Sequence, residues 1–192
     1  MTIELELETE ASREVCSNLI VRKARISDIH PILGLINGYA AKGIMLARTE
    51  FEMSENIRDF TVAYSGGELL GCGALHFYTP TTAEVRSLAV EPRMKKLGIG
   101  RIVVEALEQE ARENELHAIF AFTYVPGFFS HMGFVEVDRG SLPLKAWKDC
   151  LRCPKFQCCD EIAVLKALCD DPVLDIPARL TNLLVELPQV RR

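Results

Sequence analysis

The sequence lacks long apolar runs, a net positive charge and a basic, apolar start. Its uninterrupted apolar stretches fall short of the roughly 18 residues that a membrane helix needs, so we expect no membrane span. The net charge of −5 weighs against a nucleic-acid partner, because phosphate binding needs a basic face. A small anionic ligand stays open, because a local pocket can be basic on an acidic protein. The acidic N-terminus is unlike a secretory signal, and we therefore expect a cytoplasmic protein.

The composition is that of a folded domain. The chain has 192 residues, of which 48% are hydrophobic and 26% charged. We predict one domain over residues 18–168, a solvated extension over 1–17 and a C-terminal tail over 169–192 whose role is open. The sequence leaves the oligomeric state undecided, with a homodimer among the alternatives.

The seven cysteines are an odd number, and four of them lie close together. A cytosolic setting makes a disulfide framework unexpected. Cys150 and Cys153 have the spacing of a metal-ligand pair, but the adjacent Cys158 and Cys159 would rarely both bind one ion. We therefore favour free structural thiols over a metal or iron–sulfur site or a redox pair, and we assign no metal ligand.

The first part of the chain alternates between strand and helix patterns. Residues 18–24 are typical of a short strand. A helix follows over 27–40, with Ser27 as its cap and apolar residues on one face. A second, short helix is predicted over 54–60, with Ser54 as its cap.

The middle of the chain changes to a strand pattern. Turns separate three strands, which predicts an antiparallel meander over 60–64, 69–78 and 83–90. An amphipathic helix begins at Ile99, and an apolar strand over 117–125 follows it. Strand, helix and strand in close succession predict a parallel pair joined by a crossover.

Shorter elements complete the pattern. Pro126 starts and Gly133 ends a short helix, and a strand covers 134–137. Residues 142–151 read as another helix, and a strand over 160–168 could close the sheet. The order β-α-α-β-β-β-α-β-α-β predicts an α+β domain with a mixed sheet.

Two glycines and several basic residues stand where the amphipathic helix begins. A helix N-terminus presents unpaired N–H groups and a positive dipole end, and glycine lets the backbone approach an anion. Gly98 and Gly100 do not form a Walker A loop, because Arg101 follows where that loop has lysine. A dinucleotide fingerprint needs a third glycine where Val103 stands. The stretch is therefore a diphosphate site of another kind or a glycine turn with solvated lysines.

Residues 84–100, EVRSLAVEPRMKKLGIG, resemble the acetyl-CoA-binding core of the GNAT family of N-acetyltransferases. The family pattern is a strand, a turn and Gln/Arg-x-x-Gly-x-Gly/Ala opening a helix. Lys95, Gly98 and Gly100 fall at the marked positions, and lysine still donates to phosphate. The element order matches over residues 20–138, so the resemblance implies the GNAT fold, a mixed, mostly antiparallel sheet flanked by helices.

The same resemblance implies a site for acetyl-CoA as co-substrate. Acetyl-CoA would lie between the strands over 83–90 and 117–124, with its pyrophosphate on the N–H groups of residues 95–101. The residues expected to bind it are Leu88, Ala89, Val90, Lys95, Lys96, Leu97, Gly98, Ile99, Gly100 and Arg101.

The resemblance also implies direct attack of an amine on the thioester. Glu84 matches the glutamate that deprotonates the amine in histone acetyltransferases of the family; alternatively it is a strand carboxylate paired with Arg86. A carboxylate in a partly desolvated cleft suits the role of base. Phe129 stands where the family often has a tyrosine acid, and phenylalanine donates no proton. Tyr124, at the end of a strand, is our candidate for the acid, with solvent as the alternative.

Longer strings resemble one branch of the family, the short, stand-alone N-acetylglutamate synthases. These enzymes acetylate the α-amino group of an amino acid at the start of arginine biosynthesis. The strings cover residues 21–49, 71–78, 83–92 and 147–164.

That branch implies a small amino-acid acceptor, and L-glutamate is the first candidate. Each glutamate carboxylate suits a bidentate arginine, and we predict Arg48 and Arg86 as substrate-binding residues. His76 could face the acceptor cleft, although a packed or solvated histidine is the commoner case. Two alternatives stay open: the acceptor is another small amine or a peptide N-terminus, or the domain senses acyl-CoA without turnover.

Overall fold

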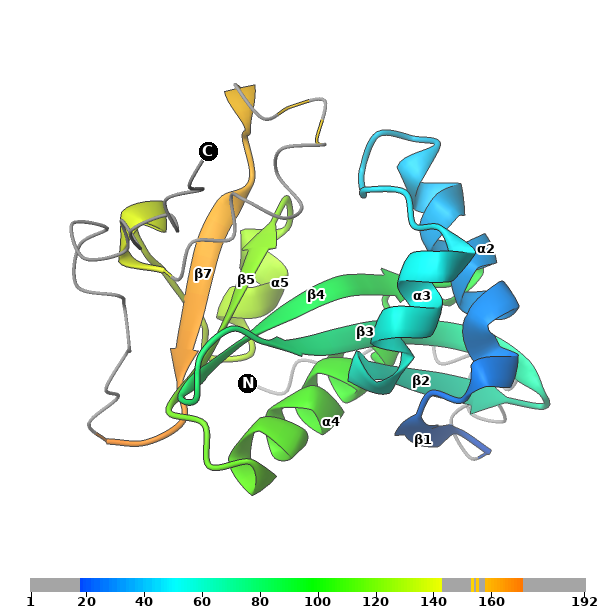
Figure 1. Ribbon diagram of the computed structural model, residues 1–192, viewed down its shortest axis with the longest axis horizontal. Helices are drawn as coiled ribbons and strands as arrows, with labels where there is room; N and C mark the ends of the chain where they lie inside the picture. The colour runs from blue at the N-terminus through cyan, green and yellow to red at the C-terminus, as the bar shows by residue number, and fades with distance from the viewer. Residues whose placement is uncertain (1–17, 143–152, 154, 156–157, 171–192) are drawn as a thin grey trace, which may run out of the picture.

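The computed structural model describes residues 18–142, 153, 155 and 158–170. It contains a seven-stranded sheet in the order β1-β2-β3-β4-β5-β7-β6 (Figure 1). The β4–β5 pair is parallel and the other neighbouring pairs are antiparallel. This confirms the predicted α+β architecture with a mixed, mostly antiparallel sheet. The division of the chain into extension, domain and tail stays a prediction.

The strands and helices follow the predicted order. The strands are β1 (Ile20–Lys23), β2 (Phe60–Ser65), β3 (Glu68–Phe77), β4 (Thr82–Val90), β5 (Ala118–Thr123), β6 (Val135–Glu136) and β7 (Ile162–Ala167). The α-helices are α2 (Ile29–Ala40), α3 (Glu50–Asn56), α4 (Ile99–Glu113) and α5 (Pro126–Ser130). The 3-10 helices are η1 (Ile26–Asp28), η2 (Ile57–Asp59), η3 (Pro92–Met94) and η4 (Arg139–Ser141).

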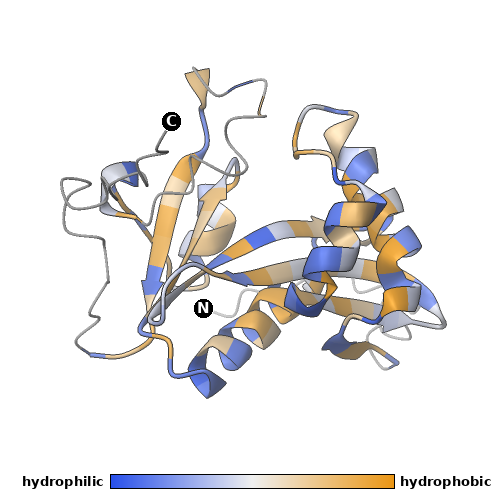
Figure 2. Ribbon diagram, viewed as in Figure 1, coloured by the Kyte–Doolittle hydropathy of each residue, from blue (hydrophilic) through white to orange (hydrophobic). Residues whose placement is uncertain are grey.

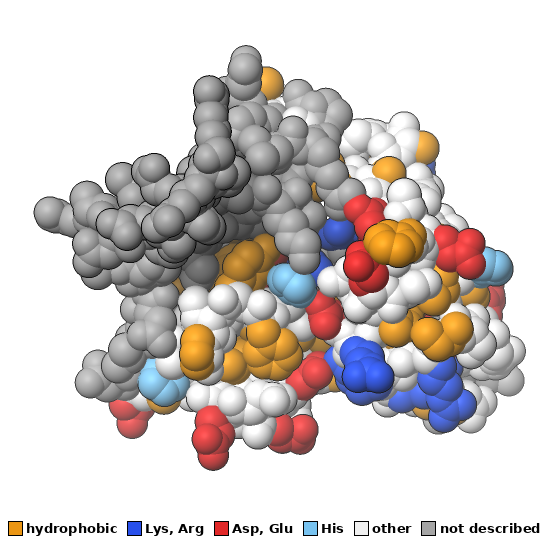
Figure 3. Space-filling model, in the orientation of Figure 1, with side chains coloured by type: hydrophobic (Ala, Val, Ile, Leu, Met, Phe, Trp, Pro, Cys, Tyr) orange, Lys and Arg blue, Asp and Glu red, His pale blue; other side chains and the backbone are white. Residues whose placement is uncertain are grey.

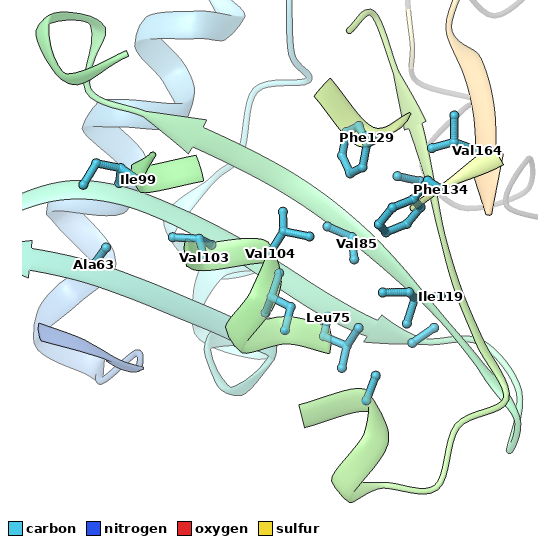
Figure 4. Close-up of a cluster of buried hydrophobic side chains, with 14 of the residues drawn as sticks. Ala63, Leu75, Val85, Ile99, Val103, Val104, Ile119, Phe129, Phe134 and Val164 are labelled. Atoms are coloured by element: carbon cyan, nitrogen blue, oxygen red, sulfur yellow. The ribbon is translucent and has the colours of Figure 1, made fainter. Parts of the chain in front are cut away.

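Helices cover both faces of the sheet. The apolar stripe of α4 packs on one face, where Val103 and Val104 meet Leu75 and Val85 (Figure 4). Hydrophilic and hydrophobic residues alternate around this helix in Figure 2, as the sequence period predicts. The helices α2 and α3 bury residues such as Ile36 on the opposite face. Within the part of the chain described, no helix has the length and apolar character to span a bilayer.

The predicted meander is present, and its third strand carries a β-bulge. Across β3 and β4, Ala74 faces Arg86 but Cys72 faces Ala89, so one β3 residue opposes two on β4. Ser87, inside this bulge, has a positive φ of 53°. Bulges bend a strand and redirect the side chains beyond it. Simple alternation along β4 therefore fails after Arg86.

The predicted start of the first long helix is wrong in detail. Ser27 lies inside η1 and caps nothing; α2 begins two residues later, at Ile29. The carboxylate at the junction is Asp28, which accepts the backbone N–H of Arg25 at 2.7 Å and a guanidinium N–H of Arg22 at 2.7 Å. The chain enters α2 through this ion pair rather than through a serine cap.

The second helix begins four residues earlier than predicted. Thr49 caps α3 in a capping box, accepting the N–H of Glu52 while the Glu52 carboxylate accepts the N–H of Thr49. Ser54, the predicted cap, lies inside the helix and donates to the carbonyl of Glu50 at 2.9 Å. The Thr-x-x-Glu pattern was visible in the sequence and is the stronger start signal.

The strand predicted over 160–168 is present as β7. It joins the sheet between β5 and β6. It pairs with β5 over six residues and with β6 over two, so the long pairing takes the inner position. The helix predicted over 142–151 falls outside the described residues, apart from Leu142, as do the N-terminal extension and most of the tail.

Candidate active site

The strands β4 and β5 pair only at their beginnings. Residues 82–84 face residues 118–120 in parallel register, and the recorded pairing ends at Glu84. Beyond that point Figure 1 shows the two strands diverging, with β4 running toward α2. The divergence lies where the sequence resemblance places acetyl-CoA. Glu84 marks its apex.

The glycine turn lies at the end of the diverging β4. Gly98 is the N-cap residue of α4 with a φ of +82°, and no atom lies within 4 Å of a Cβ built there. Lys96 also has a positive φ, 67°, which costs a residue with a side chain about 1–3 kcal/mol. The first N–H groups of α4 have no partner within the helix, and its positive dipole end points here. An anionic diphosphate fits such a turn through backbone donors.

Side chains of the predicted cofactor stretch divide into two groups. Lys95, Lys96 and Gly98 are exposed, whereas Ile99 is buried in the core and Leu97 packs against it. Because the side chains of Leu97 and Ile99 are apolar, these residues can contribute only backbone groups to an anionic ligand.

Arg101 is exposed and donates to Glu105 at 2.7 Å, a bond that raises the pKa of Arg101. The Nζ atom of Lys95 lies 4.8 Å from the ring centroid of Tyr39. The Tyr39 hydroxyl donates to the carbonyl of Val90 at 2.6 Å. Together these contacts tie α2 to both the end of β4 and the glycine turn.

Two glycines of β3 bring the helix close to the sheet, a feature that the sequence analysis missed. A Cβ on Gly71 would lie 2.9 Å from Ile99, and one on Gly73 would lie 3.0 Å from Val103. The Gly-x-Gly spacing in this strand was the available signal, because glycine in a strand often marks a close approach. Leu88 and Ala89 lie beside these glycines; Ala89 is buried and Leu88 half-buried.

Glu84 lies where three strands meet. It faces His76 on β3 and Phe120 on β5, and it is 1% exposed. The hydroxyl of Tyr78 donates to its Oε2 at 3.1 Å. A buried carboxylate that accepts from Tyr78 at the apex of the divergence is placed to accept a proton from a group bound there.

A second set of polar groups lies close to Glu84. Arg86, two residues along β4, is 7% exposed, and its Nη2 lies 3.7 Å from Asp59 and 3.4 Å from Asn56. The Nδ1 atom of His76 lies 2.6 Å from the same Asp59 oxygen. The structure thus gathers residues of α3, η2, β3 and β4 around the predicted base. Asp59 and Asn56 had no sequence signal of their own.

The predicted acid and the other predicted arginine lie on different elements. Tyr124 follows β5 and is 37% exposed, with its hydroxyl 3.3 Å from the Nζ of Lys155. Burial raises the pKa of Tyr124, although the bond from Lys155 opposes the shift. Arg48 lies in the loop before α3, which Asn37 holds by two hydrogen bonds to the Arg48 backbone at 2.9 and 3.0 Å.

Phe129 is a core residue and takes no part in the site. It is 3% exposed and packs edge-on against Phe128 and Phe134, with ring centroids 5.1 Å apart in each case (Figure 4). At the position that often carries tyrosine in the family, this chain thus has a phenylalanine that packs in the core. The acid must come from elsewhere.

The described cysteines are free thiols. Cys72, Cys153, Cys158, Cys159 and Cys169 form no disulfide, and Cys150 falls outside the described residues. Burial raises the pKa of Cys72 to about 12, which makes its thiol unreactive. Among the side chains that the structure places, no three His, Cys, Asp or Glu residues gather as metal ligands would.

A cavity of about 390 Å³ lies between α4, the residues that follow α5, and β7. Glu108 lies in its wall and accepts from Lys166 at 2.6 Å and from Arg112 at 2.8 Å. These charges are paired with one another. Glu84, Arg48 and Arg86 do not line this cavity, but Arg101, one of the residues predicted to bind acetyl-CoA, does.

Known proteins resemble this chain in sequence. An uncharacterized N-acetyltransferase of Chlorobaculum tepidum is 45% identical over 148 residues, which make up 77% of this chain and 96% of that protein. An amino-acid acetyltransferase of Mycobacterium tuberculosis is 38% identical over 122 residues, 62% of this chain and 70% of that protein.

Solved structures resemble it in fold. N-acetylglutamate synthase from Neisseria gonorrhoeae, complexed with coenzyme A and N-acetyl-glutamate, has a TM-score of 0.71 at 25% identity, covering 79% of this chain and 35% of that one. Residues 37–134 match the acetyltransferase (GNAT) family. That span holds the diverging strands, the bulge and the glycine turn. The chain therefore belongs to the GNAT acetyltransferases, enzymes whose co-substrate is acetyl-CoA.

Proposed function

We propose that the protein transfers the acetyl group of acetyl-CoA to the α-amino group of an amino acid. The acceptor that we favour is L-glutamate, whose acetylation begins arginine biosynthesis. The observation that carries the proposal is the position of Glu84 and Arg86. Both are buried, they lie on one strand, and Glu84 marks the apex of the β4–β5 divergence. The amino-acid acetyltransferase of Mycobacterium tuberculosis and the Neisseria enzyme with N-acetyl-glutamate support it.

In this reaction Glu84 accepts a proton from the acceptor ammonium, and the freed amine attacks the thioester carbonyl carbon. A C–N bond forms, the C–S bond breaks, and coenzyme A leaves as a thiolate that takes up a proton. Tyr124 is our candidate donor, because its phenol carries a proton at neutral pH, although burial raises its pKa and makes it a weaker acid. Backbone N–H groups of residues 95–101 hold the pyrophosphate.

Recognition of glutamate needs two cationic partners, one for each carboxylate. Arg86 is buried next to the base, and a buried guanidinium binds a carboxylate through paired hydrogen bonds. Arg48 lies in a loop that Asn37 anchors to α2. We assign one acceptor carboxylate to each arginine.

A panel of amino acids tests this assignment through the rate of coenzyme A release. We expect glutamate to have the highest kcat/KM. Loss of one charge-assisted pair costs about 1.5–3 kcal/mol, so Arg48→Ala should raise the KM for glutamate about 10-fold to 100-fold. Arg25→Ala, at an exposed position before η1, is the control and should leave that KM unchanged.

One observation favours a second acceptor class. Arg86 lies against Asp59, and α3 adds the exposed carboxylates of Glu50 and Glu55. Figure 3 shows acidic side chains on the surface over α3. Such surroundings suit an acceptor with fewer negative charges, such as another small amine or a peptide N-terminus. Release with lysine but not with glutamate would reject the glutamate proposal in favour of this one. Binding of acetyl-CoA without release for any amine tried would indicate a sensor.

A further inference from the structure

A histidine and an aspartate beside the predicted base have no part in the reaction described above. His76 on β3 lies directly opposite Glu84 on β4. Its Nδ1 lies 2.6 Å from Oδ2 of Asp59, and its ring meets that of Tyr78 edge-on with centroids 5.2 Å apart. The Tyr78 hydroxyl donates to Glu84 at 3.1 Å. Tyr78 and His76, which meet through their rings, therefore both lie beside the base, and Asp59 lies behind His76.

Acetylation of an ammonium group releases one proton for each turnover. The ammonium must lose one proton before its nitrogen can attack. The nitrogen loses a second proton when the amide forms, and the leaving thiolate gains one proton, so these two changes cancel. Glu84 is 1% exposed, so a proton on its carboxylate needs a neighbouring group to reach water. The side chain of His76 is 19% exposed, and imidazole gains and loses protons readily near neutral pH.

Asp59 determines which ring nitrogen of His76 is basic. An ionised carboxylate can only accept, so the Nδ1 that faces it carries the proton of the neutral ring. The lone pair then lies on Nε2, as in other histidines that a carboxylate orients. The charged and titratable groups around the ring are Asp59 from η2, Tyr78 from the same strand, Glu84 from β4, and Arg86 at 3.7 Å from Asp59.

We propose that His76, oriented by Asp59, takes the acceptor's first proton from Glu84 and passes it to solvent. The proposal rests on the proposed function. The proton moves from the ammonium to the Glu84 carboxylate, then to Nε2 of His76, which becomes an imidazolium beside Asp59, and then to water. Both side chains return to their starting states, and only N–H and O–H bonds change. Asp59 acts as a positioning residue.

Steady-state kinetics of His76→Gln test the relay, with His30→Gln as the control because His30 is exposed on α2. We expect kcat to fall about 10-fold to 100-fold, in line with general acid–base contributions. The KM for acetyl-CoA should stay unchanged. The acidic limb of the kcat–pH profile should shift, and added imidazole should restore activity to His76→Ala. Lower kcat with an unchanged pH profile and no rescue would show a purely structural role and overturn the proposal.

A measurement on the resting protein separates this proposal from the choice of acceptor. The ring-nitrogen NMR signals of His76 report its tautomer without any substrate. We expect Nδ1–H in the wild-type protein and loss of that preference in Asp59→Asn. An Nε2–H ring in the wild-type protein overturns the relay, whatever the acceptor. If glutamate is not acetylated but another amine is, the kinetic test is run with that amine.

Discussion

The two ends of β4 build their parts of the site in different ways. At its C-terminal end, the glycine turn offers backbone N–H groups at the start of α4, while Lys95 and Lys96 are exposed and Ile99 is buried in the core. At its N-terminal end, Glu84 and Arg86 are buried among side chains from η2, α3 and β3. Backbone groups are enough to bind a co-substrate that a whole family shares. Selection of one acceptor depends on side chains such as Glu84 and Arg86.

The largest expected effect is a loss of kcat caused by a substitution at the acceptor end of β4. Glu84→Gln keeps the shape of the side chain and can still accept from Tyr78, but it cannot take a proton from an amine. We expect kcat to fall about 100-fold to 10,000-fold, because general bases contribute that much. The KM for acetyl-CoA should not change. Glu136→Gln, exposed on β6, is the control, and a fall in kcat of less than about 10-fold would place the base elsewhere.

An effect of intermediate size on stability is expected from the ion pair between Arg22 and Asp28, which lies at neither end of β4. The side-chain bond from Arg22 lowers the pKa of Asp28 from 3.8 to about 2. A lowered pKa stabilises the fold above the unfolded value near 3.8, and this contribution is lost as the pH falls toward 2. Asp28→Asn should therefore lower the free energy of unfolding by about 2 kcal/mol at pH 6.

The same difference should shrink between pH 4 and pH 2, as urea unfolding at several pH values would show. At pH 6 the variant's kcat should stay at the wild-type value. A reduced kcat would mean that loss of stability alone disturbs the site, which would weaken conclusions from the other variants. A constant difference down to pH 2 would contradict the lowered pKa.

A smaller effect concerns the glycine turn at the cofactor end, where loss of stability from backbone strain can be distinguished from weaker binding of acetyl-CoA. Gly98 and Gly66 both have positive φ values, 82° and 59°, and both have open space where a Cβ would lie. Alanine at either position should cost about 1 kcal/mol of stability, because residues with a Cβ rarely adopt this conformation. Only Gly98→Ala should also raise the KM for acetyl-CoA. Equal KM values for the two variants would remove the glycine turn from the site.

The contrast between the two ends also explains what the sequence could predict. The glycine turn is a local pattern, since Lys95, Gly98, Gly100 and the apolar period of α4 lie within one continuous stretch. The family, the element order and the meander follow from such local signals. The start of α3 was equally local, and Thr49 was overlooked in favour of Ser54.

The acceptor end depends on register, which local patterns do not determine. Asp59 and His76 are 17 residues apart in the sequence. They meet because η2 leads directly into β2, whose first residues pair with β3. The bulge at Ser87 shifts every later residue of β4 relative to β3. A pattern with period two predicts neither contact, because one inserted residue reverses which face a side chain occupies.

The smallest expected effect concerns the proton that the leaving thiolate takes up. Burial raises the pKa of Tyr124, which lies beside Lys155 after β5, so its phenol is protonated across the neutral range but is a weak acid. Solvent is a competing donor, because a thiol with an ordinary pKa of about 8.5 is a fair leaving group. Tyr124→Phe should therefore lower kcat only about 3-fold to 10-fold. Tyr64→Phe, on β2, is the control. A larger loss would make the tyrosine essential, and no loss would assign the proton to water.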